Sequence, residues 1–375
     1  MMIKEMLITT DHLIARRLKA FREERGLTQA ALADRMGFAS RQTLASIEAG
    51  DRPITSEELV RAAGLLRVEL SDFTDPFRLV GEGEFSFRAA GVPSEILDGF
   101  ERTARQWVAT YRTLRERAGV PRSHLGSKLE LREDSTYEAA QSAAEELRRE
   151  WNMGDVPAEV LVDVIERELG ARVLFVDAPH GISGAAVHLP GLLTILVNRH
   201  ESLGRRHFDI AHELFHLLTW DAMRPDRVEP HETPRGKGNR VEKLAENFAG
   251  ALLMPGDVVL GRWEQRGDTQ LHDWLNAVAT SLRVSSVALK WRLVVLGVLS
   301  KPEAEAVDDA RLAANGGQES DATPLPFGHE FIARVHGAVE EGHLSLRRAV
   351  QLLGMTAWEF SDLCGAYGVV LSYEV

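Results

Sequence analysis

The sequence predicts a multi-domain protein that is mainly α-helical and carries one small sheet. A chain of 375 residues is too long for one ordinary hydrophobic core, so two or three domains are expected. Several segments repeat apolar residues every three or four positions, which is the spacing of an amphipathic helix. Short β-rich runs gather in residues 172–198. We therefore expect an all-α N-terminal domain, a central α+β domain and a small helical C-terminal segment.

The composition is that of a soluble globular protein, with 44% hydrophobic and 27% charged residues. We find neither a secretory leader nor an apolar run long enough to span a bilayer, and the single cysteine, Cys364, suits a reducing compartment. A cytoplasmic protein without membrane contact is therefore expected. The net charge of −12 argues against nucleic-acid affinity over the whole surface, but it does not exclude a local basic module.

Residues 1–75 are expected to form such a module from four helices. The first helix is amphipathic and basic, and it ends at Gly26. Thr28 and Ser40 are typical N-cap residues for the next two helices. The second, third and fourth helices are expected at residues 29–36, 41–48 and 56–66.

The N-terminal module also carries a sequence pattern, Gly-Leu-Thr-Gln followed by Ile-Glu-Ala-Gly, that resembles the Xre/Cro type of helix-turn-helix. The resemblance implies that the third helix enters the major groove of DNA. The alternative is a helical bundle that serves dimerisation or partner docking. The residues expected to contact DNA are Gln29 and Ser40 at phosphates, and Arg41, Gln42 and Ser46 at base edges.

Residues 76–150 are expected to form a helical connector that can act as a dimerisation arm. A short aromatic stretch, residues 77–87, can form a strand or a hairpin. The chain is helical from Pro93 onward, and residues 138–151 again have an amphipathic pattern. A homodimer is compatible with this segment.

The central domain, residues 151–300, is expected to begin with a helix and three strands. Such a small twisted sheet can run an edge strand along a cleft, where the backbone of a peptide pairs with it. Residues 183–187 are the expected edge. The helix is read at residues 158–169 and the strands at 172–176, 181–187 and 193–198.

The sequence His-Glu-x-x-His at residues 212–216 carries the clearest chemical signal. On a helix, His212 and His216 lie one turn apart on the same face, so both can bind one metal ion. Glu213 lies about 100° further round the helix, where its carboxylate can act as a general base without being a ligand. The alternative is a solvated helix that carries two histidines by chance.

A second helix is expected at residues 240–254, stopped by Pro255. Glu242 and Glu246 lie one turn apart on this helix, away from its apolar face. A catalytic zinc site usually has three protein ligands, so one glutamate can supply the third while the other orients a histidine. For pairs of glutamates in general, an acidic solvated face is the more common explanation.

Together the two motifs closely resemble those of the ImmA/IrrE metallopeptidases, over roughly residues 150–300. The resemblance implies a zincin-like fold that binds one zinc ion (Zn2+) per chain through His212, His216 and Glu242. That family usually has Asn or Asp where this chain has Glu246, which leaves Glu246 as an orienting residue or as the alternative ligand. The implied substrate is a transcriptional repressor of the Xre/Cro type, cut at one specific bond.

The remaining segments are a loop, a linker and a C-terminal segment. Residues 220–238 are polar and contain several prolines and glycines, and they are expected to form a lid. Residues 301–326 are acidic and rich in small residues, which predicts a linker. Residues 327–375 are expected to form two or three short helices and a tail, residues 368–373, that packs as a strand or recognises a partner.

The sequence therefore favours a DNA-binding zinc endopeptidase with Glu213 as the catalytic base. Its substrate is expected to be a repressor, in stress response, mobile-element or toxin–antitoxin control, or the chain itself or a second copy. In toxin–antitoxin control, a toxin is a further expected partner. The alternative is a non-enzymatic regulator or antitoxin that uses the zincin domain as a sensor or docking module. The intact pair of histidines with Glu213 favours the enzyme, because sensing needs no base beside a metal, whereas the DNA-binding module favours the regulator.

Overall fold

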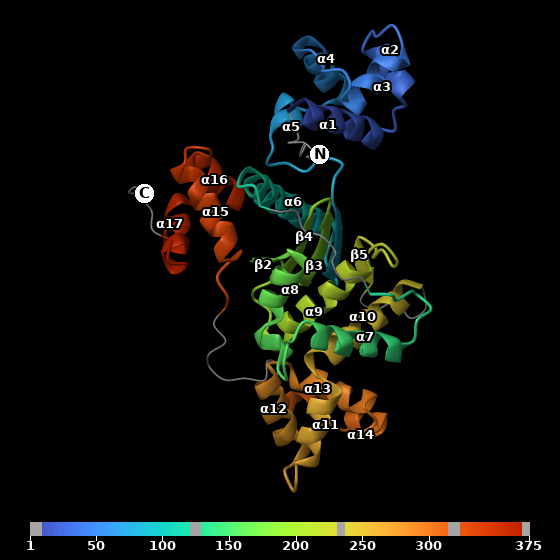
Figure 1. Ribbon diagram of the computed structural model, residues 1–375, viewed down its shortest axis with the longest axis vertical. Coiled ribbons are helices and arrows are strands. Elements are labelled where there is room, and N and C mark those ends of the chain that lie inside the picture. The colour runs from blue at the N-terminus through green and yellow to red at the C-terminus, as the bar shows by residue number, and fades with distance from the viewer. Residues whose placement is uncertain (1–9, 121–128, 231–236, 314–322, 370–375) are drawn as a thin grey trace, which may run out of the picture. The chain divides into compact units, whose positions relative to one another are not determined.

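A computed structural model describes residues 10–120, 129–230, 237–313 and 323–369. The chain divides into two compact units, residues 1–83 with 103–114, and residues 84–102 with 115–375. The first unit is helical, and the second contains a sheet among many helices (Figure 1). The predicted class, a mainly α chain with a small sheet, is confirmed.

The first unit packs five short helices around one apolar core. Thr28 caps the second helix, since its hydroxyl accepts a hydrogen bond from the backbone N–H of Ala31 at 3.1 Å. Gly50 ends the third helix with a φ of 81°, a left-handed conformation that favours glycine. Of these five helices, the sequence predicted the second, third and fourth to within one residue and the end of the first to within two, but it did not predict the fifth. They are α1 (Thr10–Glu24), α2 (Gln29–Arg35), α3 (Arg41–Ala49), α4 (Ser56–Leu66) and α5 (Leu70–Thr74).

The second unit is built on a mixed five-stranded sheet in the order β2-β4-β3-β1-β5. β3 pairs antiparallel with β4 and with β1, whereas the β2–β4 and β1–β5 pairs are parallel. Pro190 and Gly191 connect β3 to β4 as a tight hairpin. The strands are β1 (Glu84–Ala89), β2 (Arg172–Val176), β3 (Ile182–Leu189), β4 (Leu192–Asn198) and β5 (Val228–Pro230).

β3 is an inner strand, so the expectation that residues 183–187 form an edge is wrong. β1 pairs with β3 along the side that was expected to be a free edge, with Phe85 opposite Val187 and Phe87 opposite Ala185. The side chains of β3 are almost all buried as well. The reason for the error is physical: β1 comes from a distant part of the chain, and pairing over that separation leaves no trace in the local pattern.

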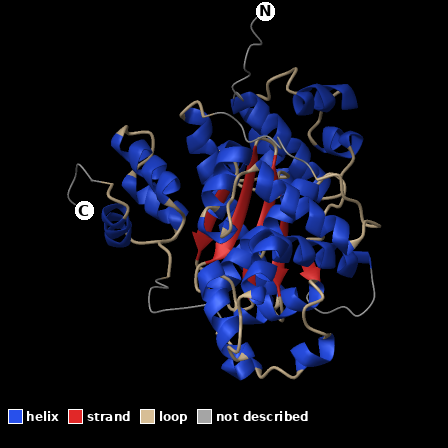
Figure 2. Cartoon of the chain, turned by 60° about the horizontal axis from the view of Figure 1, so that its bottom comes forward, coloured by secondary structure: helices blue, strands red, loops and turns tan. Residues whose placement is uncertain are grey.

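Three helices stack on one another outward from the sheet. α9 (Leu203–Thr219) lies against β3 and β4, α10 (Lys237–Leu253) packs on α9, and α7 (Tyr137–Glu150) packs on α10. Figure 2 shows the strands surrounded by helices. Phe215 of α9 and Phe248 of α10 are fully buried, with ring centroids 5.5 Å apart. This apolar contact fixes which faces of α9 and α10 meet. α8 (Leu161–Leu169) covers α9 and β2.

Residues 76–150, expected to be a helical connector, contribute to the cores of both units. Their aromatic stretch supplies β1, and α7 belongs to the main core of the second unit. The long helix α6 (Ser94–Arg117) has its middle part in the first unit, where the Thr113 hydroxyl donates a hydrogen bond of 2.8 Å to the carbonyl of Pro76. These roles depend on contacts over long sequence separations.

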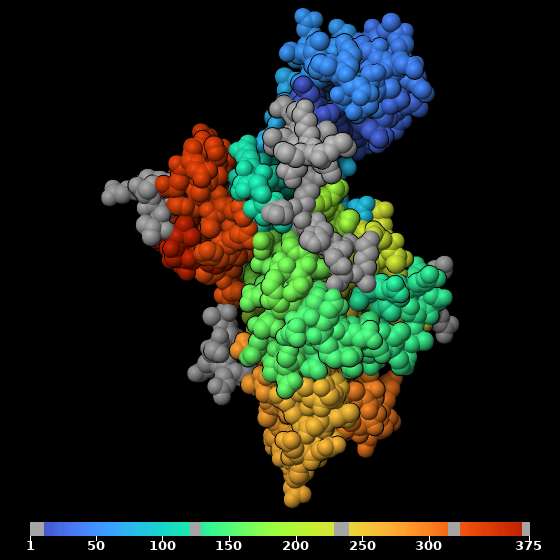
Figure 3. Space-filling model, in the orientation of Figure 1, coloured from blue at the N-terminus to red at the C-terminus, as the bar shows by residue number. Residues whose placement is uncertain are grey.

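A helical subdomain follows α10 and continues into the expected linker. Arg148 of α7 forms an ion pair with Asp257 at 3.0 Å, and Figure 3 shows the surfaces of α7 and of these later helices adjoining. At the start of residues 301–326, the preceding Ser300 forms a capping box with Glu303 and Ala304 is buried, so the first part of this segment is a helix. The helices are α11 (Gly256–Glu264), α12 (Leu271–Leu282), α13 (Ser286–Val295) and α14 (Lys301–Glu305).

The C-terminal segment is helical, as predicted. Its helices are joined to the sheet through Phe327, whose backbone forms a bridge with Phe175 of β2. The expected tail at residues 368–373 lies mostly outside the described residues. Within the described ranges, every helix is too short or too polar to serve as a transmembrane segment. The helices are α15 (His329–Glu340), α16 (Leu346–Leu353) and α17 (Ala357–Ala366).

Candidate functional site

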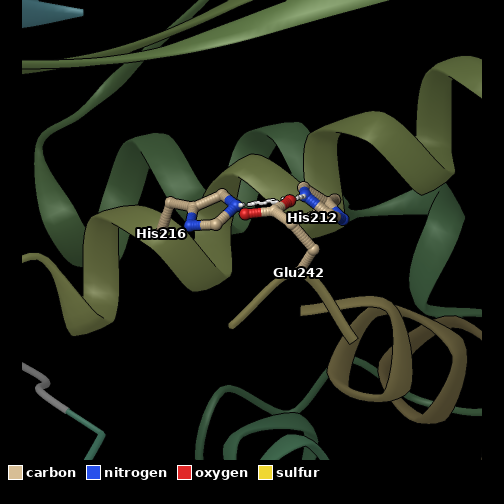
Figure 4. A group of neighbouring side chains, drawn as sticks. All are labelled: His212, His216 and Glu242. Atoms are coloured by element: carbon tan, nitrogen blue, oxygen red, sulfur yellow. Dashed lines mark hydrogen bonds and ion pairs between the residues drawn. The ribbon is translucent and has the colours of Figure 1, made fainter. Parts of the chain in front are cut away.

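His212 and His216 of α9 converge with Glu242 of α10 at the contact between the two helices (Figure 4). The two Nε2 atoms are 3.0 Å apart. The Oε2 atom of Glu242 lies 3.1 Å from Nε2 of His212 and 3.6 Å from Nε2 of His216. The four-residue spacing puts both imidazoles on one face of α9, and the packing of α10 brings the carboxylate to them.

These separations fit one small cation. Zinc binds nitrogen and oxygen ligands at about 2.0–2.2 Å in a tetrahedral arrangement, which spaces the ligand atoms about 3.3 Å apart. Two imidazoles with one carboxylate are a donor set of catalytic zinc sites. In the part of the chain that the structure describes, no second group of three such side chains has this geometry. The group of His212, His216 and Glu242 can therefore hold a metal ion.

The protonation of His212 is suited to metal binding. Burial lowers its pKa well below 6.5, and the nearby Arg88 and His216 lower it further, while Glu242 opposes the shift. The imidazole is therefore neutral at pH 7. A neutral imidazole has the free electron pair that a metal ligand needs.

The lowered pKa of His212 predicts acid sensitivity of the metal-free protein. The unfolded chain takes up this proton at about pH 6.5, before the folded chain does, so the free energy of unfolding falls as pH drops below that value. The expected loss is about 1.4 kcal/mol for each unit of pKa shift. Urea unfolding with a chelator at pH 7.5, 6.5 and 5.5 measures it. His212→Gln should flatten this dependence and His343→Gln, on the surface, should not; equal slopes for both variants would contradict the assignment.

Glu213, the expected general base, is fully buried beneath the sheet. A Cβ atom on Gly184 of β3 would lie 3.6 Å from its Oε1 atom and 3.0 Å from the carbonyl oxygen of Leu196. Glycine at position 184 therefore lets β3 lie close to this carboxylate. Glu213 directly follows His212 in the sequence. Its side chain lies between α9 and β3.

Three further charged residues, Arg88, Arg205 and Asp209, lie near the site and were missed by sequence reasoning. Arg88 of β1 is buried, with its Nη1 atom 3.5 Å from Oδ1 of Asp209 and its guanidinium over the Phe208 ring. Arg205 donates to the other Asp209 oxygen at 3.1 Å. Burial raises the pKa of Asp209, while Arg88 and Arg205 lower it. The Arg205–Asp209 spacing of four residues was a usable signal for this pair, but Arg88 had none because its strand is distant in sequence.

Glu246 lies outside the group of His212, His216 and Glu242 that could hold a metal ion. It lines a neighbouring cavity of about 360 Å³ and remains open to solvent. Desolvation of its carboxylate raises the pKa of Glu246, and the charge of Glu242 also raises it. The positive charges of Arg88, Lys243 and Arg205 lower it. The structure thus separates two glutamates that the sequence left as alternatives.

The first unit presents the start of α3 to solvent. Ser40, Arg41 and Gln42 are exposed, and Ser46 is half-buried. Gln29 is also half-buried, and its side-chain amide donates a hydrogen bond of 2.9 Å to Glu48. The structure therefore brings four of the five expected DNA contacts to one helix and its N-cap, with Gln29 bonded to that helix.

The fold and the candidate site define the class of protein. One chain contains both a helix-turn-helix DNA-binding domain and a metallopeptidase-like domain. Residues 18–73 match the family model of a helix-turn-helix, and residues 166–294 match that of the IrrE N-terminal-like domain of the peptidase M78 family. The chain therefore contains both domains, as the resemblances implied.

Comparison with individual proteins adds little. No curated protein is similar enough to match. The crystal structure of Bacillus thuringiensis PlcR in complex with the peptide PapR7 and DNA is 11% identical, over 95% of this chain and 93% of that one. Its TM-score of 0.17 is too low to carry an argument about the fold.

Proposed function

We propose that this protein is a DNA-binding zinc endopeptidase that cuts one specific bond in a transcriptional repressor. The observation that carries the proposal is the convergence of His212, His216 and Glu242 in a domain that matches a peptidase family. Glu213 follows the first ligand, as a general base for hydrolysis requires. A binding module alone would need no such base.

The chemistry divides between the metal and this chain's own residues. His212, His216 and Glu242 would hold the zinc ion, which supplies a Lewis acid when bound. Glu213 accepts a proton from the attacking water and then passes it to the leaving amide nitrogen. Its burial limits competition from bulk water for that proton. The neutral state of His212 keeps the ligand set ready at pH 7.

The helix-turn-helix domain supports a repressor as the substrate. A peptidase that binds DNA is concentrated where DNA-bound repressors are found, so encounter with them becomes more frequent. The same arrangement allows cleavage of the chain itself or of a second copy, because the chain carries a domain of the repressor type.

Metal content of the purified protein tests the site directly. We expect about one zinc per chain by plasma mass spectrometry. Glu242→Ala should bind zinc at least about 100-fold more weakly, because even outer partners of zinc ligands typically contribute 10–100-fold. Glu246→Ala is the matched control, one turn along the same helix, and should keep its zinc. If wild type holds no metal after zinc is supplied, the peptidase proposal fails.

The second candidate is a regulator that acts through DNA alone, and the exposed start of α3 favours it. Arg41→Ala and Gln42→Ala should each weaken binding to a selected operator by about 1–3 kcal/mol, because each removes a contact to a base edge. Lys19→Ala, on α1, is the control for loss of charge. Gel shifts measure the effect, and unchanged affinity in both variants would exclude α3 as the reading helix.

Cleavage separates the two candidate functions. Operator binding by wild type without cleavage of a co-encoded repressor would favour the regulator. Cleavage of that repressor by the zinc-loaded protein, with loss of cleavage on chelation, would favour the peptidase.

A further inference from the structure

The cavity beside the metal centre is the strongest unassigned feature of the second unit. It has a volume of about 360 Å³ and lies between the start of α9, the second half of α10 and α13. That volume is in the range of sites that bind small molecules or large side chains.

The cavity continues the helix faces that carry the metal ligands. Phe208 lies one turn before His212 on α9, and Glu246 lies one turn after Glu242 on α10. Both Phe208 and Glu246 line the cavity. One helical turn is about 5.4 Å, and an extended peptide advances about 3.3 Å per residue. A peptide that runs along these two helices with its scissile bond at the group of His212, His216 and Glu242 would place a side chain one or two residues away at this cavity.

The cavity wall is mainly apolar. Trp291 and Val295 of α13 are large apolar side chains that remain 38% and 48% exposed. An apolar occupant would remove this surface from water, which is favourable. The apolar lining consists of Phe208, Met254, Val287, Ala288, Trp291 and Val295.

The charges around the cavity largely offset one another. Arg205 is bonded to Asp209, and Arg292 lies 3.5 Å from the carboxylate of Glu145 and donates to the carbonyl of Met254 at 3.0 Å. Glu246 interacts with the positive charges of Arg88 and Arg205. A charged side chain entering the cavity would lose hydration without a net attraction to compensate. This balance favours an uncharged occupant.

Two glycines line the cavity and play different parts in its shape. A Cβ atom on Gly204 would lie 2.4 Å from the backbone nitrogen of Ser285, so this glycine allows α9 to approach the start of α13. On Gly250, a Cβ atom would meet only Met254 Cε, at 3.9 Å. Glycine inside a helix costs about 0.5–1 kcal/mol relative to alanine. Gly250 carries this cost where the backbone does not require it, and its missing side chain leaves the space empty.

We propose that this cavity is the specificity pocket of the peptidase and receives a large apolar side chain of the substrate, one or two residues from the bond that is cut. The proposal rests on the proposed peptidase function. It assigns the substrate class by side-chain chemistry: a repressor segment with an aromatic or large aliphatic residue near the cleavage point.

Direct binding provides a test that does not depend on activity. The probes are the N-acetyl amides of phenylalanine, lysine and aspartate, titrated against the zinc-loaded full chain with tryptophan emission as the readout. The phenylalanine amide should bind at least about 10-fold more tightly than the other two, because only it buries its whole side chain. Trp291→Phe should remove the emission change, which locates the probe. Equal binding of the three amides would overturn the proposal.

Gly250 offers a matched pair of variants. Gly250→Leu should fill the cavity and weaken the phenylalanine amide at least about 10-fold, whereas Gly250→Ala should change it by less than about 2-fold. Zinc content and thermal unfolding show whether each variant is folded. Unchanged binding in a folded Gly250→Leu variant would place the probe elsewhere and overturn the proposal.

Cleavage of a mixed peptide library separates this proposal from the proposed function. Zinc-loaded wild type should prefer an apolar residue at one position near the cut, and Gly250→Leu should lose that preference. Cleavage without such a preference overturns the cavity proposal alone. A complete absence of cleavage, even of a co-encoded repressor, overturns the peptidase function and with it the substrate role of the cavity.

Discussion

Glu213→Gln is expected to lower the rate of repressor cleavage by about 10²–10⁴-fold while zinc stays at about one per chain. Glutamine has nearly the same shape as glutamate but cannot accept a proton at neutral pH, so the loss measures general-base catalysis. Because Glu213 is outside the group of His212, His216 and Glu242, metal binding should survive. The measurement is the single-turnover rate of cleavage, together with metal content.

The control for this change is Glu264→Gln, which makes the same substitution on the exposed end of α11. It should leave both the rate and the zinc content unchanged. Full activity in Glu213→Gln would show that another group takes the proton. Loss of zinc in that variant would instead show that Glu213 supports the ligands.

Glu48→Ala is expected to destabilise the N-terminal unit by about 3–5 kcal/mol and to abolish specific DNA binding with it. Arg22 is buried, and its guanidinium makes two bonds to the Glu48 carboxylate, at 2.6 and 2.9 Å. Without Glu48, the buried guanidinium keeps only the more exposed Glu23, at 3.1 Å, and the carbonyl of Leu27, so most of its compensation is lost, which is the costly way to break such a pair. Glu48 lies on α3 and Arg22 on α1, so the pair fixes the proposed reading helix to the rest of the unit. Urea unfolding of the full chain and gel shifts measure the two effects.

Two further variants test whether the loss of stability in Glu48→Ala comes from the buried charge of Arg22. Arg22→Met combined with Glu48→Leu replaces the pair by apolar side chains and should recover most of the stability, because no charge is left buried. Glu57→Ala removes an exposed acid on α4 and should change the unfolding free energy by less than about 0.5 kcal/mol. A loss below about 1 kcal/mol in Glu48→Ala would mean that water or another acid compensates Arg22.

The two glutamates of α10 show where sequence reasoning stopped at the metal site. Their spacing puts both on one face, so the pattern alone could not decide between Glu242 and Glu246 as the donor beside the histidines. The decision depends on the rotation and height of α10 against α9, which the buried contact of Phe215 with Phe248 fixes. In that arrangement Glu242 reaches the histidines, and Glu246 lies one turn further on, at the cavity.

The sequence by itself determined the local features of this protein. The His-Glu-x-x-His spacing, the N-caps and the glycines that end helices act within one or two helical turns, so the pattern is sufficient to place His212 and His216 together and to locate α2, α3 and α4. The tertiary structure alone decided the pairing of β1 with β3, the burial of Arg88 beside Asp209 and the cavity next to the candidate metal site. These features bring together residues that are far apart in the chain, and their free energy comes from packing and desolvation between elements, which no local pattern records.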